Sequence, residues 1–182
     1  YSYGDDAKAI QAITIKGGVF ATNGAEMYAE DNGYIFVPNA DGMYEAQEGA
    51  YVAQVVKQDN TIVKYTVLND ALAAAQAGET VEIFAGTFTQ NLNINKDITV
   101  VGERDAEGNN LVTFNGKLNI TADGATAKNL NVNNGGSTAG SINAKDVLVE
   151  GCDVTGGNGF RYCYTTGTVT FRNSKITGAT YG

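Results

Sequence analysis

Apolar residues recur along residues 81–182 at a spacing of 22, in short alternating segments separated by polar turns. When the sequence is aligned with itself at this offset, the apolar side chains superimpose in columns. The columns are Ala125, Val147 and Val169; Ala127, Val149 and Phe171; Val132, Val154 and Ile176; and Ile120, Ile142 and Tyr164. A fixed period of about 20 to 30 residues is typical of a solenoid, in which each coil buries its apolar face against its neighbours. The pattern therefore predicts an all-β chain folded as a right-handed parallel β-helix.

The charged residues test this alignment independently, because equivalent residues on successive coils lie about 4.8 Å apart in a parallel sheet. At the same offset, every adjacent charged pair has opposite sign. The pairs are Lys128 with Glu150, Glu150 with Arg172, Asp123 with Lys145, and Asp153 with Lys175. Such pairs stabilise neighbouring strands by roughly 0.2 to 1 kcal/mol each. We therefore interpret these side chains as outward-facing ladders of ion pairs.

Residues 58–182 are the predicted β-helix. Residues 68–77 form its capping helix, because the segment is rich in alanine, with Thr66 as N-cap and Gly78 just past the end. We expect this helix to cover the open core of the first coil, residues 81–97. The second coil is longer, and its extra length falls in a polar loop at 103–110 that can bulge outward.

Residues 1–57 are predicted to be a separate module, rich in β-hairpins. One hairpin joins residues 34–37 to 43–46, because Asn, Asp and Gly between them supply a turn, and another joins 51–57 to 61–67 through Gln58, Asp59 and Asn60. Residues 12–20 have the pattern of a β-helix strand, so we expect them to be the last coil of an earlier solenoid. No cap follows the coil that begins at Val169, and we expect the chain to be part of a longer polypeptide.

Composition narrows the function classes. The net charge of -8 argues against nucleic acid or an anionic membrane surface as partner, since both need a basic face. No apolar run reaches the roughly 18 residues that suggest a membrane span, so we expect no membrane insertion within this segment. The chain has no histidine, which excludes Ser-His-Asp and Cys-His catalysis and histidine-containing metal sites. We expect no cofactor.

The two cysteines, Cys152 and Cys163, are too few for a zinc site and lie half a coil apart. Cys152 shares a column with Leu130 and Ser174, which favours a small buried thiol over a disulfide.

Asp146, Glu150 and Asp153 are the nearest approach to a catalytic carboxylate group. They are weak candidates, because they share one coil and two of them have basic partners in the ladders.

Phe160, Arg161, Tyr162 and Tyr164 are the candidate ligand-binding residues. Strand alternation would turn the three aromatic residues to one face and Arg161 with Cys163 to the other. If the aromatic side chains face inward, they fill space above Gly140 in the core. If they face outward, they form a platform that could stack on a sugar ring.

Two resemblances cover nearly the whole chain. Residues 13–20, 28–29 and 39–44 resemble a module common in large surface proteins of gut bacteria, where it looks like a cap on a β-helix. Residues 65–75, 78–88 and 92–102 are similar to the pectin-lyase-like β-helix superfamily.

These resemblances imply a secreted or cell-surface bacterial protein, with host or microbial glycans or surface proteins as partners. They favour a non-catalytic structural or adhesion module that displays or spaces binding regions. One alternative is a carbohydrate-active enzyme, a polysaccharide lyase or a glycoside hydrolase, because enzymes of this superfamily can work without histidine, using Asp-bound calcium and an Arg or Lys base. The other alternative is a glycan-binding module.

Overall fold

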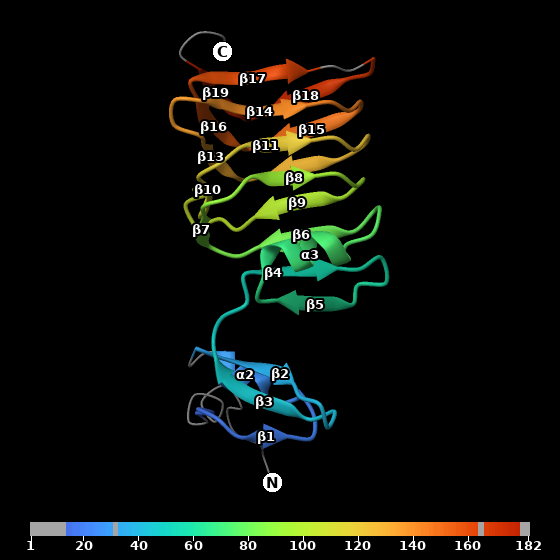
Figure 1. Ribbon diagram of the computed structural model, residues 1–182, viewed down its shortest axis with the longest axis vertical. Helices are drawn as coiled ribbons and strands as arrows, with labels where there is room; N and C mark the ends of the chain where they lie inside the picture. Colours follow the sequence, from blue (N-terminus) through green and yellow to red (C-terminus); the bar gives the residue numbers. More distant parts are fainter. Residues whose placement is uncertain (1–13, 31–32, 164–165, 179–182) are drawn as a thin grey trace. The chain divides into compact units, whose positions relative to one another are not determined.

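The computed structural model describes residues 14–30, 33–163 and 166–178, without the side chains of 161–163 (Figure 1). The chain divides into two compact units, Tyr1–Tyr51 and Val52–Gly182.

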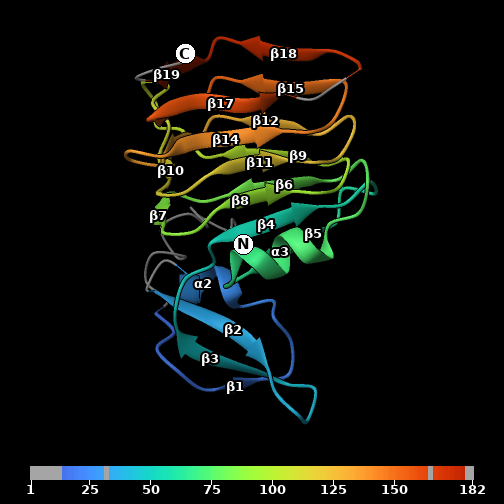
Figure 2. The same cartoon turned by 45° about the horizontal axis from the view of Figure 1, so that its top comes forward.

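The second unit is a parallel β-helix, in which each coil contributes one strand to each of three sheets (Figures 1 and 2). The first sheet contains β6 (Thr80–Ile83), β9 (Thr99–Gly102), β12 (Thr126–Lys128), β15 (Val147–Glu150) and β18 (Val169–Arg172). The second contains β7 (Gly86–Phe88), β10 (Val112–Phe114), β13 (Asn131–Asn133), β16 (Asp153–Gly156) and β19 (Lys175–Gly178). The third contains β8 (Leu92–Ile94), β11 (Leu118–Ile120), β14 (Thr138–Ile142) and β17 (Asn158–Cys163). The predicted parallel β-helix is confirmed.

The inward columns form the core. Ala127 pairs with Val149 and Val132 with Val154, each at the predicted offset. All four side chains are buried. Most of the largest fully buried side chains belong to inward positions of the three sheets. They include Ile83, Leu92, Ile94, Phe114, Leu118, Ile120 and Ile142. Burying one such side chain contributes roughly 1.5 to 3 kcal/mol, so stacking of these columns is the main stabilising interaction of the unit.

One predicted column is wrong at its last member, because Ile142 pairs with Cys163 and not with Tyr164. The register shifts in β17: Gly140 pairs with Phe160, but the next residue, Ser141, pairs with Tyr162. Such a β-bulge adds one residue to a strand and changes which residues share a face after it. After Phe160 the backbone of β17 therefore departs from the simple alternation expected from the sequence.

A hairpin and a helix precede the first coil. The hairpin of β4 (Ala53–Val56) and β5 (Ile62–Tyr65) is confirmed, and β4 also pairs antiparallel with β6, which extends the first sheet. For this reason the hairpin belongs wholly to the β-helix unit, and a boundary after residue 57 would cut through it.

The predicted capping helix is present as α3 (Leu68–Ala74), and its buried face packs on the core of the β-helix. It is shorter than the predicted 68–77. Thr66 is not its N-cap. That position belongs to Val67, which has an extended backbone and makes no side-chain capping bond.

The first unit contains β1 (Val19–Phe20), α2 (Glu26–Glu30), β2 (Tyr34–Pro38) and β3 (Tyr44–Glu48). The predicted hairpin of β2 and β3 is confirmed, and the Asn39 side chain accepts hydrogen bonds from two backbone N–H groups in its turn. Of residues 12–20, the described part is a strand only in β1, which pairs antiparallel with β3. An end coil of a parallel β-helix can also pair antiparallel, as β6 does with β4, and residues 12 and 13 lie outside the described residues, so the earlier solenoid stays a prediction. The helix α2 was not predicted.

The extra length of the second coil lies between β9 and β10, as predicted. Asp105 closes the loop by accepting hydrogen bonds from the backbone and the side chain of Asn109. At its base, Arg104 Nη2 and Asn110 Nδ2 donate to the carbonyl oxygen of Gly151, at 3.2 and 2.9 Å. The loop therefore folds back on the side of the β-helix.

Three of the four predicted pairs form ion pairs in the described coils, and the fourth, Asp153 with Lys175, is in register without an ion pair. Glu150 lies 3.1 Å from Lys128 Nζ and 3.3 Å from Arg172 Nη1, and Asp123 lies 3.6 Å from Lys145 Nζ. Hydrogen bonding and charge attraction from Lys128, with a further contribution from Arg172, lower the pKa of Glu150. Glu150 is thus the centre of a three-residue ladder.

We predict that Glu150→Lys lowers the melting temperature more than Glu150→Gln, because a lysine there would face two cations on adjacent coils. The difference should shrink in high salt, which screens exposed charges. Thermal unfolding by circular dichroism measures both values. Thr155 is the matched control, because the residues in register with it on the adjacent coils, Asn133 and Thr177, are uncharged. The melting temperatures of Thr155→Lys and Thr155→Gln should therefore differ less. Equal melting temperatures for the two Glu150 variants would contradict the ladder.

Candidate functional site

The three candidate carboxylates do not form one cluster of free groups. Asp146 lies in the turn before β15, where its Oδ1 accepts a hydrogen bond from the backbone of Thr168 at 3.3 Å. Glu150 ends β15 between two cations, and Asp153 begins β16 in the next sheet, in register with Lys175. Asp146 and Glu150 are therefore engaged by the following coil, whereas Asp153 is in register with Lys175 but forms no ion pair with it among the described residues.

Phe160 is a core residue. Its ring is half-buried, packs against the inward columns and lies 5.4 Å from the ring of Phe171. A Cβ atom added to Gly140 would come within 2.9 Å of this ring, so Phe160 fills the space that Gly140 leaves open. This arrangement matches the inward alternative. The side chains of Arg161 and Tyr162 and the whole of Tyr164 lie outside the described residues, and the aromatic platform stays a prediction there.

Cys152 is the predicted buried thiol. It is a free cysteine with 1 % exposure, and its Sγ lies 3.4 Å from the carbonyl oxygen of Glu150. Burial raises the pKa of this thiol to about 11. The thiolate is the nucleophilic form, so Cys152 is unreactive at neutral pH. The side chain of Cys163 is not described.

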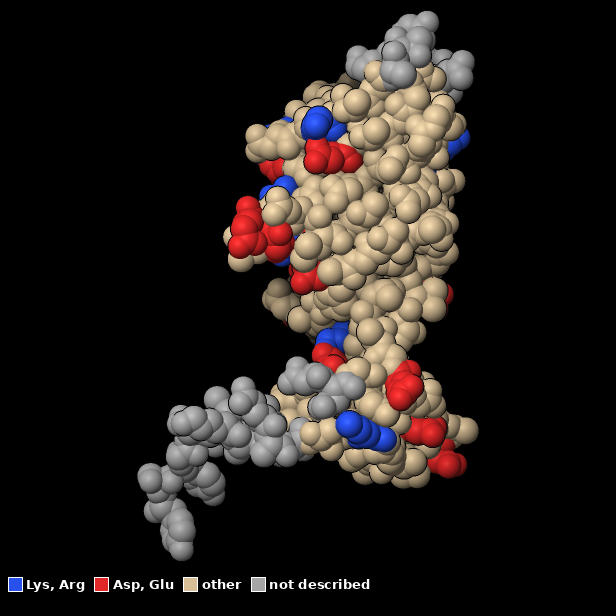
Figure 3. Space-filling model, turned by 90° about the vertical axis from the view of Figure 1, so that its left-hand side faces the viewer, with Lys and Arg blue, Asp and Glu red and all other residues tan. Residues whose placement is uncertain are grey.

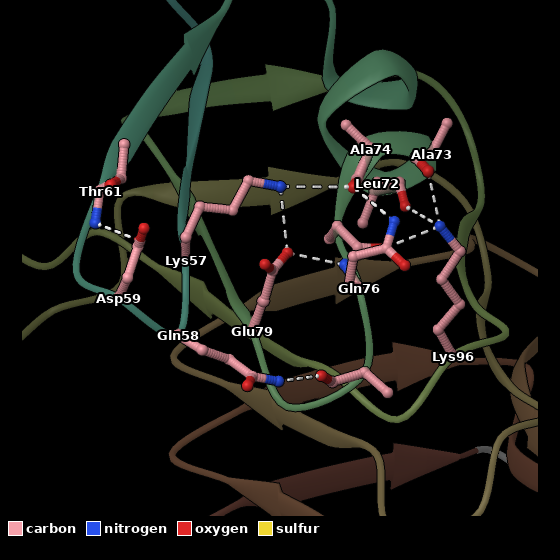
Figure 4. A network of polar contacts seen from close by, with 12 residues as sticks. Lys57, Gln58, Asp59, Thr61, Leu72, Ala73, Ala74, Gln76, Glu79 and Lys96 are labelled. Carbon is pink, nitrogen blue, oxygen red and sulfur yellow. Dashed lines mark hydrogen bonds and ion pairs between the residues drawn. The ribbon is translucent and has the colours of Figure 1, made fainter.

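Glu79 is the one buried charged side chain among the described residues, and it belongs to the polar network drawn in Figure 4. Its Oε2 accepts hydrogen bonds from the backbone N–H of Gln76 at 2.7 Å and from Lys57 Nζ at 3.2 Å. The Gln76 bond, together with the Lys57 ammonium, lowers the pKa of Glu79. The carboxylate therefore stays ionised and fixes the turn that leads from α3 into β6.

Lys96 contacts the C-terminal end of α3 directly. Its Nζ donates to the carbonyl oxygens of Leu72, Ala73 and Ala75 at 3.2, 2.6 and 2.8 Å (Figure 4). The last carbonyls of a helix have no partner within the helix and carry partial negative charge. This network is a helix cap, and its charged groups hold α3 over the first coil.

The described residues contain no group of three or more side chains that could hold a metal ion. The outward face of the second sheet, seen in Figure 3, carries few charges, and its exposed positions are mostly threonine and asparagine. No helix in the described part of the chain is long and apolar enough to cross a membrane.

A groove of about 300 Å³ lies beside the ends of β6 and β9. It is lined by Glu82, Ile83, Phe84, Val101, Gly102 and Glu103. Glu82 accepts a hydrogen bond from the Gln54 amide at 2.5 Å, and Glu103 accepts one from the backbone N–H of Ala85 at 2.7 Å. The spacing of 22 does not reveal this groove, because the groove depends on the pairing of β6 with β9, whose partners differ by 19 in sequence.

We predict that Lys96→Met destabilises the protein by about 2 to 3 kcal/mol, since three carbonyl groups of α3 would lose a charged donor. Urea unfolding measures this change. Lys117→Met is the matched control, because the Lys117 ammonium makes no hydrogen bond among the described residues. A similar decrease in the free energy of unfolding in both variants would show that the contacts of Lys96 with α3 contribute little to stability.

The lowered pKa of Glu79 also predicts how the stability of the protein depends on pH. Its pKa in the folded state is below the ordinary value of 4.5, so the unfolded chain binds the proton more readily. The stabilisation is therefore complete above pH 4.5 and is lost as the pH falls through the folded-state pKa. Melting temperatures measured from about pH 6 to about pH 3 should fall less steeply in Glu79→Gln than in the unchanged protein. Glu107→Gln, in an exposed loop, should leave the dependence of melting temperature on pH unchanged. An unchanged dependence in Glu79→Gln, with a weaker one in Glu107→Gln, would contradict this role of Glu79.

Comparisons with known proteins do not name a family for this chain. No protein-family model matches it, and no curated protein matches it either.

Proposed function

We propose that the β-helix is a non-catalytic structural module of a secreted or surface-anchored bacterial protein, where it displays or spaces binding regions. The observation that carries this proposal is the engagement of outward side chains between coils. Glu150, one of the three weak catalytic candidates, is held by a cation on the coil before it and a cation on the coil after it.

The third sheet shows the same engagement with uncharged side chains. Asn119 donates to Asn93 at 2.9 Å, and Ser141 donates to Asn119 at 3.1 Å. These residues occupy equivalent outward positions of β8, β11 and β14. Polar groups that bond their neighbours along the solenoid are less available to bind a ligand, and they stiffen the stack. Both properties suit a spacer.

The loop between β9 and β10 supports a display role. It adds non-repeating sequence to one coil, while β9 and β10 keep their pairing with the strands on either side. A solenoid that accommodates such a loop can carry variable segments on its side. The bacterial and surface location rests on the sequence resemblances, and so do surface proteins or glycans as the partners of displayed regions.

The test is to incubate the full chain with plant and host polysaccharides, with and without calcium, and to probe a glycan array with the labelled protein. We expect neither new reducing ends nor unsaturated products, and no selective retention on the array. Glu150→Gln and Asp153→Asn serve as variants of the carboxylates, Tyr162→Ala as a variant of the aromatic segment, and Thr155→Ala as the control.

Two results would overturn the proposal. Product formation that disappears in Glu150→Gln or Asp153→Asn, but not in Thr155→Ala, would make the chain a carbohydrate-active enzyme. Retention of one glycan class that is lost in Tyr162→Ala, with an unchanged melting temperature, would make it a glycan-binding module.

A further inference from the structure

The groove beside β6 and β9 interrupts the ladder of charges on the first sheet. One outward row of this sheet runs through residues in register on successive strands. In order, the row contains Lys64, Gln54, Glu82, Val101, Lys128, Glu150 and Arg172. Along Lys128, Glu150 and Arg172 each charge contacts its opposite, whereas Glu82 lies between a neutral amide and an apolar side chain. Glu82 is therefore a carboxylate in the ladder without a cation beside it.

A second carboxylate lines the same groove. Glu103 follows β9 directly, and its side chain is exposed apart from the hydrogen bond that it accepts from the Ala85 backbone. The next residue, Arg104, does not neutralise it, because the Arg104 guanidinium donates instead to Asn110 and to the carbonyl oxygen of Gly151. No ion pair within the described chain involves Glu82 or Glu103. The groove thus carries two negative charges with neutral hydrogen-bond partners.

The walls between these carboxylates are apolar. Phe84 and Val101 are half-buried and line the groove, and Ile83 closes it toward the core. An occupant that fits needs an apolar body to cover these side chains and a cationic end to meet the carboxylates. Arginine and lysine side chains have that form, since an aliphatic stem carries the charge at its tip.

We propose that this groove binds a basic side chain, preferably arginine, presented by a polypeptide partner. Arginine is favoured over lysine, because its planar guanidinium can donate to two carboxylates at once and can lie against an aromatic ring.

Other occupants fit less well. Calcium prefers six to eight oxygen ligands, and two carboxylates with neutral partners supply too few. An acidic polysaccharide would be repelled by Glu82 and Glu103, and a neutral sugar could donate hydroxyl groups to them but carries no opposite charge. The proposal is independent of the spacer function, because a β-helix without this contact would still space and display its loops.

The experiment is an NMR titration of the ¹⁵N-labelled full chain with N-acetyl-arginine N-methylamide. The matched probe is the corresponding citrulline compound, which has nearly the same shape but no charge. We expect millimolar binding of the arginine compound, with shifts concentrated at the backbone amides of Ala85, Val101 and Glu103. The citrulline compound should bind at least about tenfold more weakly.

Glu82→Gln and Glu103→Gln test the two carboxylates, and glutamine keeps an oxygen that can accept the existing hydrogen bonds, so the fold should persist. Each should weaken arginine binding about tenfold, whereas Glu107→Gln, an acid in the adjacent loop that does not line the groove, should bind as the unchanged protein does. Circular dichroism melting confirms that the variants are folded.

Three outcomes would overturn the inference: no shifts at the groove, equal binding of arginine and citrulline compounds, or unchanged binding in folded Glu82→Gln and Glu103→Gln. Shifts at the same amides on adding methyl glucoside, but not the arginine compound, would assign the groove to a sugar instead. The first three outcomes leave the polysaccharide and array test untouched, so the two proposals can fail separately.

Discussion

Stacking of equivalent residues on successive coils is the constraint on which the rest of the structure depends. A coil of this β-helix has no core of its own, and its inward side chains are buried only when the next coil places matching side chains above and below. Ala127 and Val149, in register on β12 and β15, illustrate the requirement, since both are fully buried. Because the backbone pairing brings every outward residue into line as well, the same constraint produces the rows of ion pairs and amides on the surface.

Closure of the first coil follows from this constraint. The inward side chains of β6 have no preceding parallel coil to cover them, and the chain covers them with α3 and the β4–β5 hairpin. Lysines at two separate positions, Lys57 and Lys96, donate to the carbonyl groups at the end of α3. A seven-residue helix is too short to be stable by itself, so these contacts and the packing of its buried face decide whether it forms.

The sequence predicted those parts of the fold that repeat at a constant offset. The columns through Ala127 and Val132 and the ladder around Glu150 all follow from a spacing of 22, and all are present. The prediction failed where the spacing changes. The bulge that separates Phe160 from Tyr162 adds one residue within a strand, and composition does not reveal such an addition. The acidic groove was missed for the same reason, since Glu82 and Val101 come together only through the shorter first coil.

The folded-back loop after β9 has a consequence for how the solenoid unfolds. Arg104 and Asn110 belong to the second coil, yet both donate to Gly151, in the corner between β15 and β16 of the fourth. Repeat proteins otherwise behave as one-dimensional chains with coupling between nearest neighbours only, and their end coils can fray one at a time. This loop adds a coupling between coils that are not adjacent. The second, third and fourth coils should therefore unfold as one cooperative unit, because the loop links the second coil directly to the fourth.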